Sequence, residues 1–228
     1  MRLGTRIAGR GTRGVSRAYG WREETRLSRH VPKRGAIGFL LCAFLLPLSA
    51  VAEVICALGP NAASYDATAD QRSTGDAMEM ARRLNAALSP LCTPMCPQIA
   101  IFRNSTAANA MLIVNPDQAK FVYAPKFFQT VYDRYGDGAL IAIMAHEFGH
   151  ALDEIYPARF GNAGPPELRA DAWAGCALAK VGLSPPGLAD ALIAMSKYPS
   201  PAHPGWPPRL IALRLGYTKC GGDGSKLK

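Results

Sequence analysis

Apolar residues recur at helical spacing through much of the second half of the chain. The run from Ala139 to Leu152 is apolar except for its histidine and glutamate positions, which predicts a helix over 137–155 that Tyr156-Pro157 ends. A preceding helix is predicted over 125–135, because Pro125 suits a first helical position and Gly136 suits a helix end. The same reasoning predicts other helices at about 76–88, from Pro166, at about 186–198 and before Gly216.

Three short stretches between the helices predicted at about 76–88 and at 125–135 have the composition of strands. They are 98–103, 111–114 and 120–123, and Asn115-Pro116-Asp117-Gln118 supplies a turn between the last two. Strands separated by such short connections predict a small antiparallel sheet. Together with the helices, this indicates an α+β fold, preceded by an irregular lead-in over 57–71.

Composition and charge limit the possible partners. With 228 residues, 49% apolar and 19% charged, the chain suits a single globular domain. The net charge of +9 comes mostly from residues 1–52, which hold ten Lys or Arg against two Asp or Glu. Sixteen basic and fifteen acidic residues remain beyond Ala52, so no basic surface for nucleic acid is expected.

The basic N-terminal segment is typical of an export signal. An Arg-rich tract to Arg34 precedes the apolar run 36–46, Pro47 and the small residues that end at Ala52. We expect cleavage after Ala52 and an exported protein, periplasmic or secreted, with a translation start nearer Val31 as the reason for the long tract. The alternative is an uncleaved signal anchor that tethers the protein to a membrane, although the run is shorter than a bilayer requires. The expected segments are 1–52, leader and signal peptide; 53–220, one domain; and 221–228, a flexible tail.

Five cysteines follow the predicted cleavage site: Cys56, Cys92, Cys96, Cys176 and Cys220. In an exported protein they are better read as disulfide partners than as metal ligands. We expect Cys176 to pair with Cys220 and two of the other three to pair with each other. The sequence does not decide which two.

The chemical signal in the sequence is His146-Glu147-Phe148-Gly149-His150, an H-E-x-x-H motif in the apolar helix. Residues four apart share a helix face, so His146 and His150 can direct two imidazole nitrogens to one zinc ion. Glu147 leaves the helix about 100° from His146 and is placed to act as general base on water activated by the metal. The competing interpretation is a core helix with satisfied histidines, but burying three unpaired polar side chains is costly.

Later residues supply the remaining candidates for the site. Glu167 is the expected third metal ligand, and Asp171 shares its helix face and is expected to orient a ligand imidazole. The competing interpretation for this pair is a solvated helix face. His203 is a candidate hydrogen-bond donor to the anionic intermediate or to substrate, and Tyr156 and Tyr198 are other candidates for stabilising the oxyanion.

Arg209 is expected to pair with Asp171 behind the metal. His203 could also be an ordinary exposed loop residue. These two residues therefore depend on tertiary structure more than the motif does.

The motif followed by Glu167-x-x-x-Asp171 resembles the gluzincin zinc metallopeptidases, and within them the small soluble single-domain members of the HtpX-like and CAAX prenyl endopeptidase-like family. Ala108-Asn109-Ala110 and Ala202-His203-Pro204 with Arg209 are also similar to motifs of that family. The resemblance implies an α+β domain and one Zn²⁺ per chain. It also implies that Asn109 and Ala110 belong to an edge strand that pairs with an extended peptide substrate.

The sequence thus predicts a zinc endopeptidase that cleaves peptides or proteins. The alternative is a zinc-containing binding or assembly module that lacks turnover, and a third possibility is a metal-free structural domain. No nucleic acid partner is expected, and no stable membrane span once the signal is cleaved. The short interval between His150 and Glu167 leaves little chain for a lid.

Overall fold

The computed structural model describes residues 53–57, 65–114, 118–197 and 203–228, with the backbone alone for 53–57. These residues belong to one compact unit, Pro47–Lys228. The predicted leader and its cleavage site lie outside the described residues, as does Tyr198.

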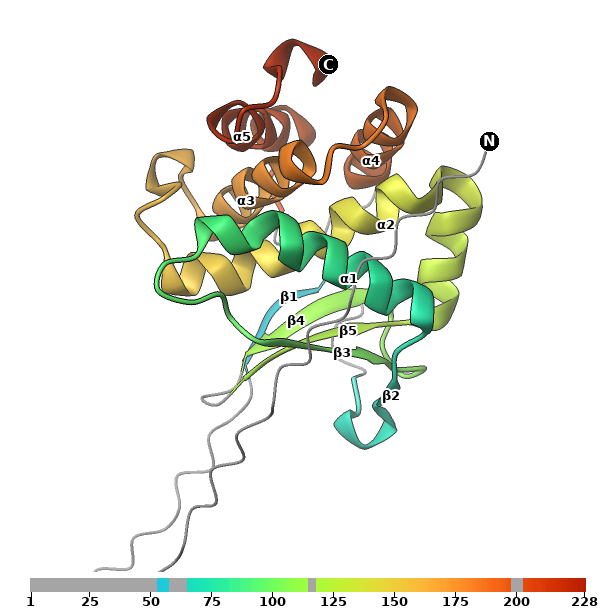
Figure 1. Ribbon diagram of the computed structural model, residues 1–228. Helices are drawn as coiled ribbons and strands as arrows, with labels where there is room; N and C mark the ends of the chain where they lie inside the picture. Colours follow the sequence, from blue (N-terminus) through green and yellow to red (C-terminus); the bar gives the residue numbers. More distant parts are fainter. Residues whose placement is uncertain (1–52, 58–64, 115–117, 198–202) are drawn as a thin grey trace, which may run out of the picture. The chain divides into compact units, whose positions relative to one another are not determined.

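A five-stranded sheet forms one side of this unit (Figure 1). Its strands lie in the order β1-β4-β5-β3-β2, where β1 is Glu53–Ala57, β2 is Gln71–Arg72, β3 is Ile99–Arg103, β4 is Ala110–Val114 and β5 is Ala119–Tyr123.

The α+β class is confirmed, but the sheet is mixed rather than wholly antiparallel. Strands β4 and β5 form the predicted antiparallel hairpin, whereas β3 and β5 are parallel, with Ile99 opposite Ala119. The reason is the path of the chain after β3. After β3 the chain forms β4 two strand positions away in the same sheet. The next strand, β5, then fills the position between β4 and β3. Strand neighbours in sequence are therefore not all neighbours in space.

Five helices make up the rest of the unit. They are α1 (Gly75–Leu88), α2 (Pro125–Ile155), α3 (Pro166–Val181), α4 (Pro185–Lys197) and α5 (Trp206–Lys219). Helix α2 contains both helices predicted over 125–155, and they meet at Gly136, whose φ of 68° is a conformation that glycine adopts without strain. Thr74 caps the start of α1, because its side chain accepts a hydrogen bond from the Ala77 amide.

The helix that carries H-E-x-x-H lies at the centre of the unit. Helices α1 and α2 cover one face of the sheet, and α3, α4 and α5 lie on the side of α2 away from the sheet (Figure 1). Phe148, within the motif, is fully buried and packs edge-on against Phe121 of β5, with ring centroids 6.0 Å apart. One face of the motif helix is thus fixed to the sheet, which leaves another face for α3.

Two parts of the chain are more ordered than the sequence predicts. The region expected as an irregular lead-in contributes β2 and a short 3-10 helix at Ala67–Ala69, and β1 precedes it. The segment 221–228 was expected to be a flexible tail, but Leu227 is fully buried and its carbonyl accepts a hydrogen bond from the Arg214 guanidinium at 2.6 Å. The physical reason is that Leu227 adds an apolar side chain to the main core.

Two disulfides join the cysteines for which side chains are described. Cys176 pairs with Cys220, as predicted, and Cys92 pairs with Cys96. Disulfides persist in oxidising compartments, so they indicate an exported environment. Among the described residues, no helix has both the length and the apolar character needed to cross a membrane.

Candidate metal centre

The motif histidines lie in the most buried part of α2. His146, Glu147 and His150 are 1%, 0% and 2% exposed, so the motif lies in a core helix; Asp171 is also fully buried, so the alternative of a solvated helix face does not apply to it. Gly149, between the two histidines, lets α3 approach closely, because a Cβ at this position would lie 2.7 Å from the Ala170 carbonyl oxygen. The motif glycine therefore helps to set the spacing between α2 and α3.

Glu167 on α3 reaches both motif histidines. Its Oε2 lies 3.4 Å from His146 Nε2 and 3.6 Å from His150 Nε2. The close approach of α3 to α2 places the start of α3, where Glu167 lies, beside the motif. The structure thus brings together the three residues that the sequence proposes as metal ligands.

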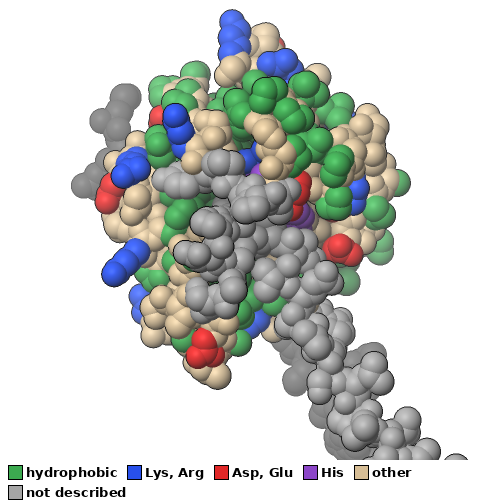
Figure 2. All heavy atoms as spheres, turned by 180° about the vertical axis from the view of Figure 1, so that it is seen from behind, with side chains coloured by type: hydrophobic (Ala, Val, Ile, Leu, Met, Phe, Trp, Pro, Cys, Tyr) green, Lys and Arg blue, Asp and Glu red, His purple; other side chains and the backbone are tan. Residues whose placement is uncertain are grey.

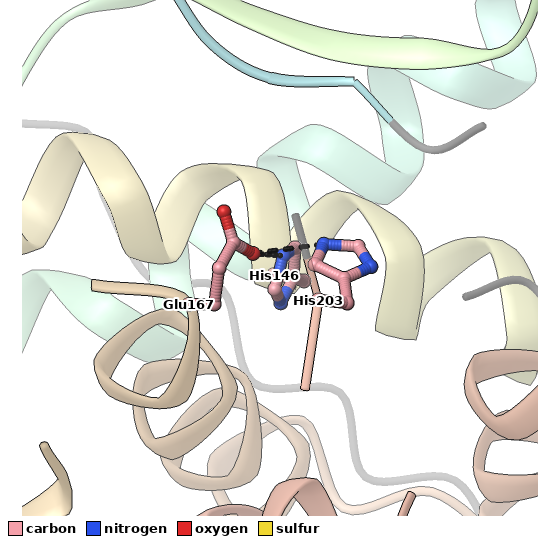
Figure 3. Close-up of side chains that lie close together, drawn as sticks. All are labelled: His146, Glu167 and His203. Atoms are coloured by element: carbon pink, nitrogen blue, oxygen red, sulfur yellow. Dashed lines mark ion pairs between the residues drawn. The ribbon is translucent and has the colours of Figure 1, made fainter. Parts of the chain in front are cut away.

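A third imidazole lies at the same carboxylate oxygen. His203, just before α5, has its Nε2 2.8 Å from Glu167 Oε2, and its side chain is fully buried. Figure 3 shows the Glu167 side chain, which comes from α3, pointing toward His146 on α2 and toward His203. Donor atoms of His146, Glu167 and His203 all lie within 4.8 Å of one another, so this buried group could hold a metal ion.

Behind His146 lies a buried chain of charged groups. His146 Nδ1 is 2.9 Å from Asp171 Oδ1, and the Asp171 carboxylate accepts hydrogen bonds from Arg209 Nε at 2.8 Å and Nη2 at 2.9 Å. Arg209 Nη1 also donates to the Met195 carbonyl at 3.1 Å. The expected pairing of Arg209 with Asp171 is therefore present. With Nδ1 held by a carboxylate, Nε2 of His146 faces the site as a potential ligand.

Burial and neighbouring charges act in opposite directions on these groups. Burial lowers the pKa of His146, but Asp171, Glu167 and Glu147 outweigh it and raise the pKa to about 9. Burial is the main reason that the pKa values of His150 and His203 are lowered. Burial would raise the pKa of Glu167, yet the three histidines around its carboxylate hold that pKa well below its usual range. Glu167 is thus ionised, and His150 and His203 favour the neutral form that binds metals.

The side chains present fit a zinc ion. At Zn–N and Zn–O bonds of about 2.0 to 2.1 Å, donors around a tetrahedral zinc are about 3.3 Å apart, close to the 2.8 to 3.6 Å separations between Glu167 Oε2 and the three Nε2 atoms. His150 Nε2 is buried and has no hydrogen-bond partner among the described residues. A buried nitrogen of this kind is costly unless something binds it.

The remaining predicted residues are placed differently. Asn109 and Ala110 are buried, and β4, expected as an edge strand, has neighbours on both sides: β1 pairs with one edge and β5 with the other. The prediction that an extended substrate pairs directly with β4 is therefore wrong, because the chain's own β1 occupies that edge. The Tyr156 hydroxyl, an alternative candidate for stabilising the oxyanion, donates a hydrogen bond to the Met95 carbonyl at 2.7 Å.

Sequence reasoning missed one contact that positions Glu167. Arg169, two residues further along α3, donates to both carboxylate oxygens of Asp153 on α2, at 2.9 and 2.7 Å, and to the Gly164 carbonyl at 2.8 Å. This pair joins the end of α2 to the start of α3 across their connecting loop. The spacing of an acidic residue seven positions after His146 and a basic residue in the next helix could have suggested it.

Access to the site is limited. The described residues contain three histidines, His146, His150 and His203, and Figure 2 shows histidine at the surface beside acidic and hydrophobic side chains. Their exposed fractions of 1 to 9% agree with this view.

Comparisons of the chain with protein-family models, with curated proteins and with solved structures found no match. The function must therefore be argued from the site itself.

Proposed function

We propose that this protein is a zinc-dependent endopeptidase, with His146, His150 and Glu167 as metal ligands and Glu147 as general base. The observation that supports it most directly is the convergence of His146 Nε2 and His150 Nε2 on one oxygen of Glu167, at 3.4 and 3.6 Å. Two imidazoles and one carboxylate are the ligand set of many hydrolytic zinc sites. The sequence resemblance to gluzincin metallopeptidases leads to the same proposal independently of this geometry.

Zinc held there would supply a Lewis acid that activates water and polarises the carbonyl of a peptide bond. Glu147 follows His146 directly on α2 and is fully buried. Its place on the helix, about 100° from His146, would put its carboxylate beside a bound metal without sharing the ligand face. In the proposal it takes a proton from the attacking water and delivers it to the leaving amine. His203, also at the site, donates a hydrogen bond to the oxygen that gains negative charge.

The direct experiment compares wild type with Glu147→Gln in a digest of a broad peptide library. We expect Glu147→Gln to retain zinc and to lose cleavage by 10²-fold or more, since the amide cannot accept the proton. Glu154→Gln is the matched control, because Glu154 lies on the same helix but is exposed. Zinc content measured by elemental analysis separates loss of base from loss of metal. Cleavage that persists in Glu147→Gln contradicts the assignment.

A second candidate is a zinc-containing binding or assembly module without turnover. The observation that favours it is the position of His203, whose Nε2 could fill the coordination position that a catalytic site leaves open. Bound zinc without cleavage of any library peptide would support this candidate, whereas turnover that a chelator abolishes would exclude it.

Export is part of the same proposal. We infer from the sequence that the chain is cleaved after Ala52, so that the secreted or periplasmic protein begins at Glu53, and the two disulfides support an oxidising destination. N-terminal sequencing of the exported protein tests this, and a retained leader would instead support the signal anchor.

A further inference from the structure

We propose that the ion pair between Asp153 and Arg169 controls how metal enters and leaves the candidate site. The closed pair holds Glu167 beside the motif histidines, and the open pair lets the first turn of α3 move away from α2. This inference rests on the proposed zinc site and adds to it the route and the barrier for metal exchange. Arg169 acts through Glu167, so it is a positioning residue.

The candidate site is closest to solvent at Glu167. The Glu167 side chain is 12% exposed, whereas the side chains of His146, His150 and His203 are 1%, 2% and 0% exposed. An ion that reaches the imidazoles from solvent meets the most accessible of these four side chains first. We therefore expect the route for metal on the side of Glu167, at the start of α3.

The later part of α3 is fixed and does not open that route. Cys176 is joined by a disulfide to Cys220 at the end of α5, and a Cβ at Gly175 would overlap the α5 backbone. Asp171, one turn after Glu167, accepts two hydrogen bonds from a side chain of α5. Movement of Glu167 is therefore confined to the first turn of α3 and the loop before it.

Arg169 ties this first turn to α2. Its Nε donates to the two carboxylate oxygens of Asp153, at 2.9 and 2.7 Å, and its Nη1 donates to the Gly164 carbonyl at 2.8 Å. Pro165, the N-cap residue of α3, makes no side-chain hydrogen bond to the free amides of the helix. The Arg169 side chain thus supplies a connection that a capping residue supplies in other helices.

The same ion pair joins the segments of two proposed ligands. Asp153 follows His150 by three residues on α2, and Arg169 follows Glu167 by two residues on α3. When the pair is closed, Glu167 Oε2 lies 3.6 Å from His150 Nε2. Opening the pair releases the α3 side of this contact, because the loop before α3 is largely exposed and turns at Gly164, whose φ is 106°.

Exposure distinguishes this ion pair from the one behind His146. The side chains of Arg169 and Asp153 are 22% and 7% exposed, against 3% and 0% for Arg209 and Asp171. Opening the Asp171–Arg209 pair leaves two buried charges uncompensated, which is costly. Arg169 is better solvated and can exchange its carboxylate partner for water. Of the two pairs, we therefore expect the Asp153–Arg169 pair to open.

Stopped-flow measurement of zinc exchange tests this inference on the full chain. Zinc-loaded protein is mixed with excess chelator to follow release, and metal-free protein is mixed with Zn²⁺ and a zinc-sensitive dye to follow uptake. We expect Arg169→Gln and Asp153→Asn each to raise both rates about tenfold, because a charge-assisted pair no longer holds the closed form. The double variant should be no faster than either single variant, since the two side chains act together.

Arg82→Gln is the matched control. Arg82 pairs with Glu79 on α1 at 2.7 Å, and the two side chains are 70% and 53% exposed. The substitution removes the same charge from a solvated ion pair, so both rates should stay at their wild-type values. Salt gives a readout that needs no variant. Higher ionic strength should speed zinc exchange in wild type, because it screens the partly exposed pair, and should leave Arg169→Gln unchanged.

The outcomes separate this inference from the proposed function. Faster release with wild-type uptake would show that the pair only holds Glu167 in place, and overturns its control of entry. Equal rates in wild type and both single variants, with equal far-UV circular dichroism, overturn the inference and leave the zinc site intact. Exchange in wild type that does not respond to salt overturns it as well. A wild-type chain that binds no zinc overturns the proposed function together with this inference.

Discussion

At the scale of single residues, Asp171 connects the candidate metal centre to the helices behind it. It is fully buried and contacts both His146 and Arg209, a guanidinium that is itself 3% exposed. A buried carboxylate with two charged partners is stabilising only while each partner is present. Its role is therefore both structural and chemical.

Asp171→Asn tests this dual role. Removing the negative charge leaves Arg209 buried and uncompensated, so we expect a loss of about 3 to 5 kcal/mol in the free energy of unfolding. We also expect metal affinity to fall 10–100-fold, because the amide orients His146 less well. Urea unfolding and chelator competition measure the two effects.

Asp153→Asn is the matched comparison, because its partner Arg169 is 22% exposed and better solvated. We expect its stability loss to be clearly smaller. Equal losses from the two variants would show that burial of the Asp171–Arg209 pair is not what matters.

The ionisation of His146 predicts how the metal-free chain responds to pH. Its pKa is raised from the ordinary 6.5 to about 9, so the folded state binds this proton more tightly than the unfolded state does. The stabilisation, about 3 kcal/mol from that shift, is fully present below pH 6.5 and is lost as the pH rises to about 9. His150 and His203 have lowered pKa values and stay neutral in this window.

Unfolding by urea in the presence of a chelator, at pH 6.5 and at pH 9, checks this expectation. The midpoint should fall at the higher pH for wild type and should change little for His146→Gln. A wild-type midpoint that does not change would contradict the assigned charge state of His146.

At the scale of elements, glycines decide how closely the helices around the site approach. A Cβ at Gly175 of α3 would overlap the backbone of Leu213 on α5, and one at Gly216 of α5 would overlap the backbone of Ala172. These two helices therefore meet backbone to backbone. Because Arg209 lies on α5 and Glu167 on α3, this contact also fixes the distance between the two sides of the site.

Gly175→Ala should separate α3 from α5. We expect a destabilisation of about 1 to 3 kcal/mol, as for other overpacked positions, and weaker metal binding. Gly75→Ala is the control, because nothing lies within 4 Å of its added Cβ and alanine favours helix by up to about 1 kcal/mol. Thermal unfolding of both variants measures the difference, and a Gly175→Ala variant as stable as wild type would refute the close contact.

At the scale of the whole molecule, the two disulfides constrain very different lengths of chain. Cys176–Cys220 spans 44 residues and joins α3 to the end of α5, whereas Cys92–Cys96 spans four. In the chain-entropy model, the longer loop is stabilised by about 4 kcal/mol and the shorter by about 2. The longer disulfide also encloses the segment that carries His203 and Arg209.

Replacing both cysteines of a pair by alanine separates the two contributions. We expect loss of Cys176–Cys220 to lower the free energy of unfolding about twice as much as loss of Cys92–Cys96 and to lower metal affinity as well. Denaturant unfolding and chelator competition give both values. Equal effects from the two double variants would argue against stabilisation through the unfolded chain.

Much of the site was predictable because its elements are local in sequence. His146 and His150 are four residues apart, so the helical repeat alone places them on one face. Glu167 and Asp171 are related in the same way on α3. The roles of Phe148 and Gly149, the two variable motif residues, became clear only in the structure: Phe148 contacts β5, and Gly149 is a point of close approach to α3.

The sequence by itself determined the helices, the β4–β5 hairpin and the residues whose chemistry suits a metal, because helical periodicity, turn residues and side-chain chemistry are local properties. It also predicted the Cys176–Cys220 pair, which spans 44 residues, from the expected export and the position of the two cysteines in the late part of the chain. Only the tertiary structure decided that β3 and β5 are parallel, that β1 covers the edge of β4, and that His203 lies at the Glu167 carboxylate. These features join segments separated by tens of residues, and their positions follow from how the whole chain packs around α2.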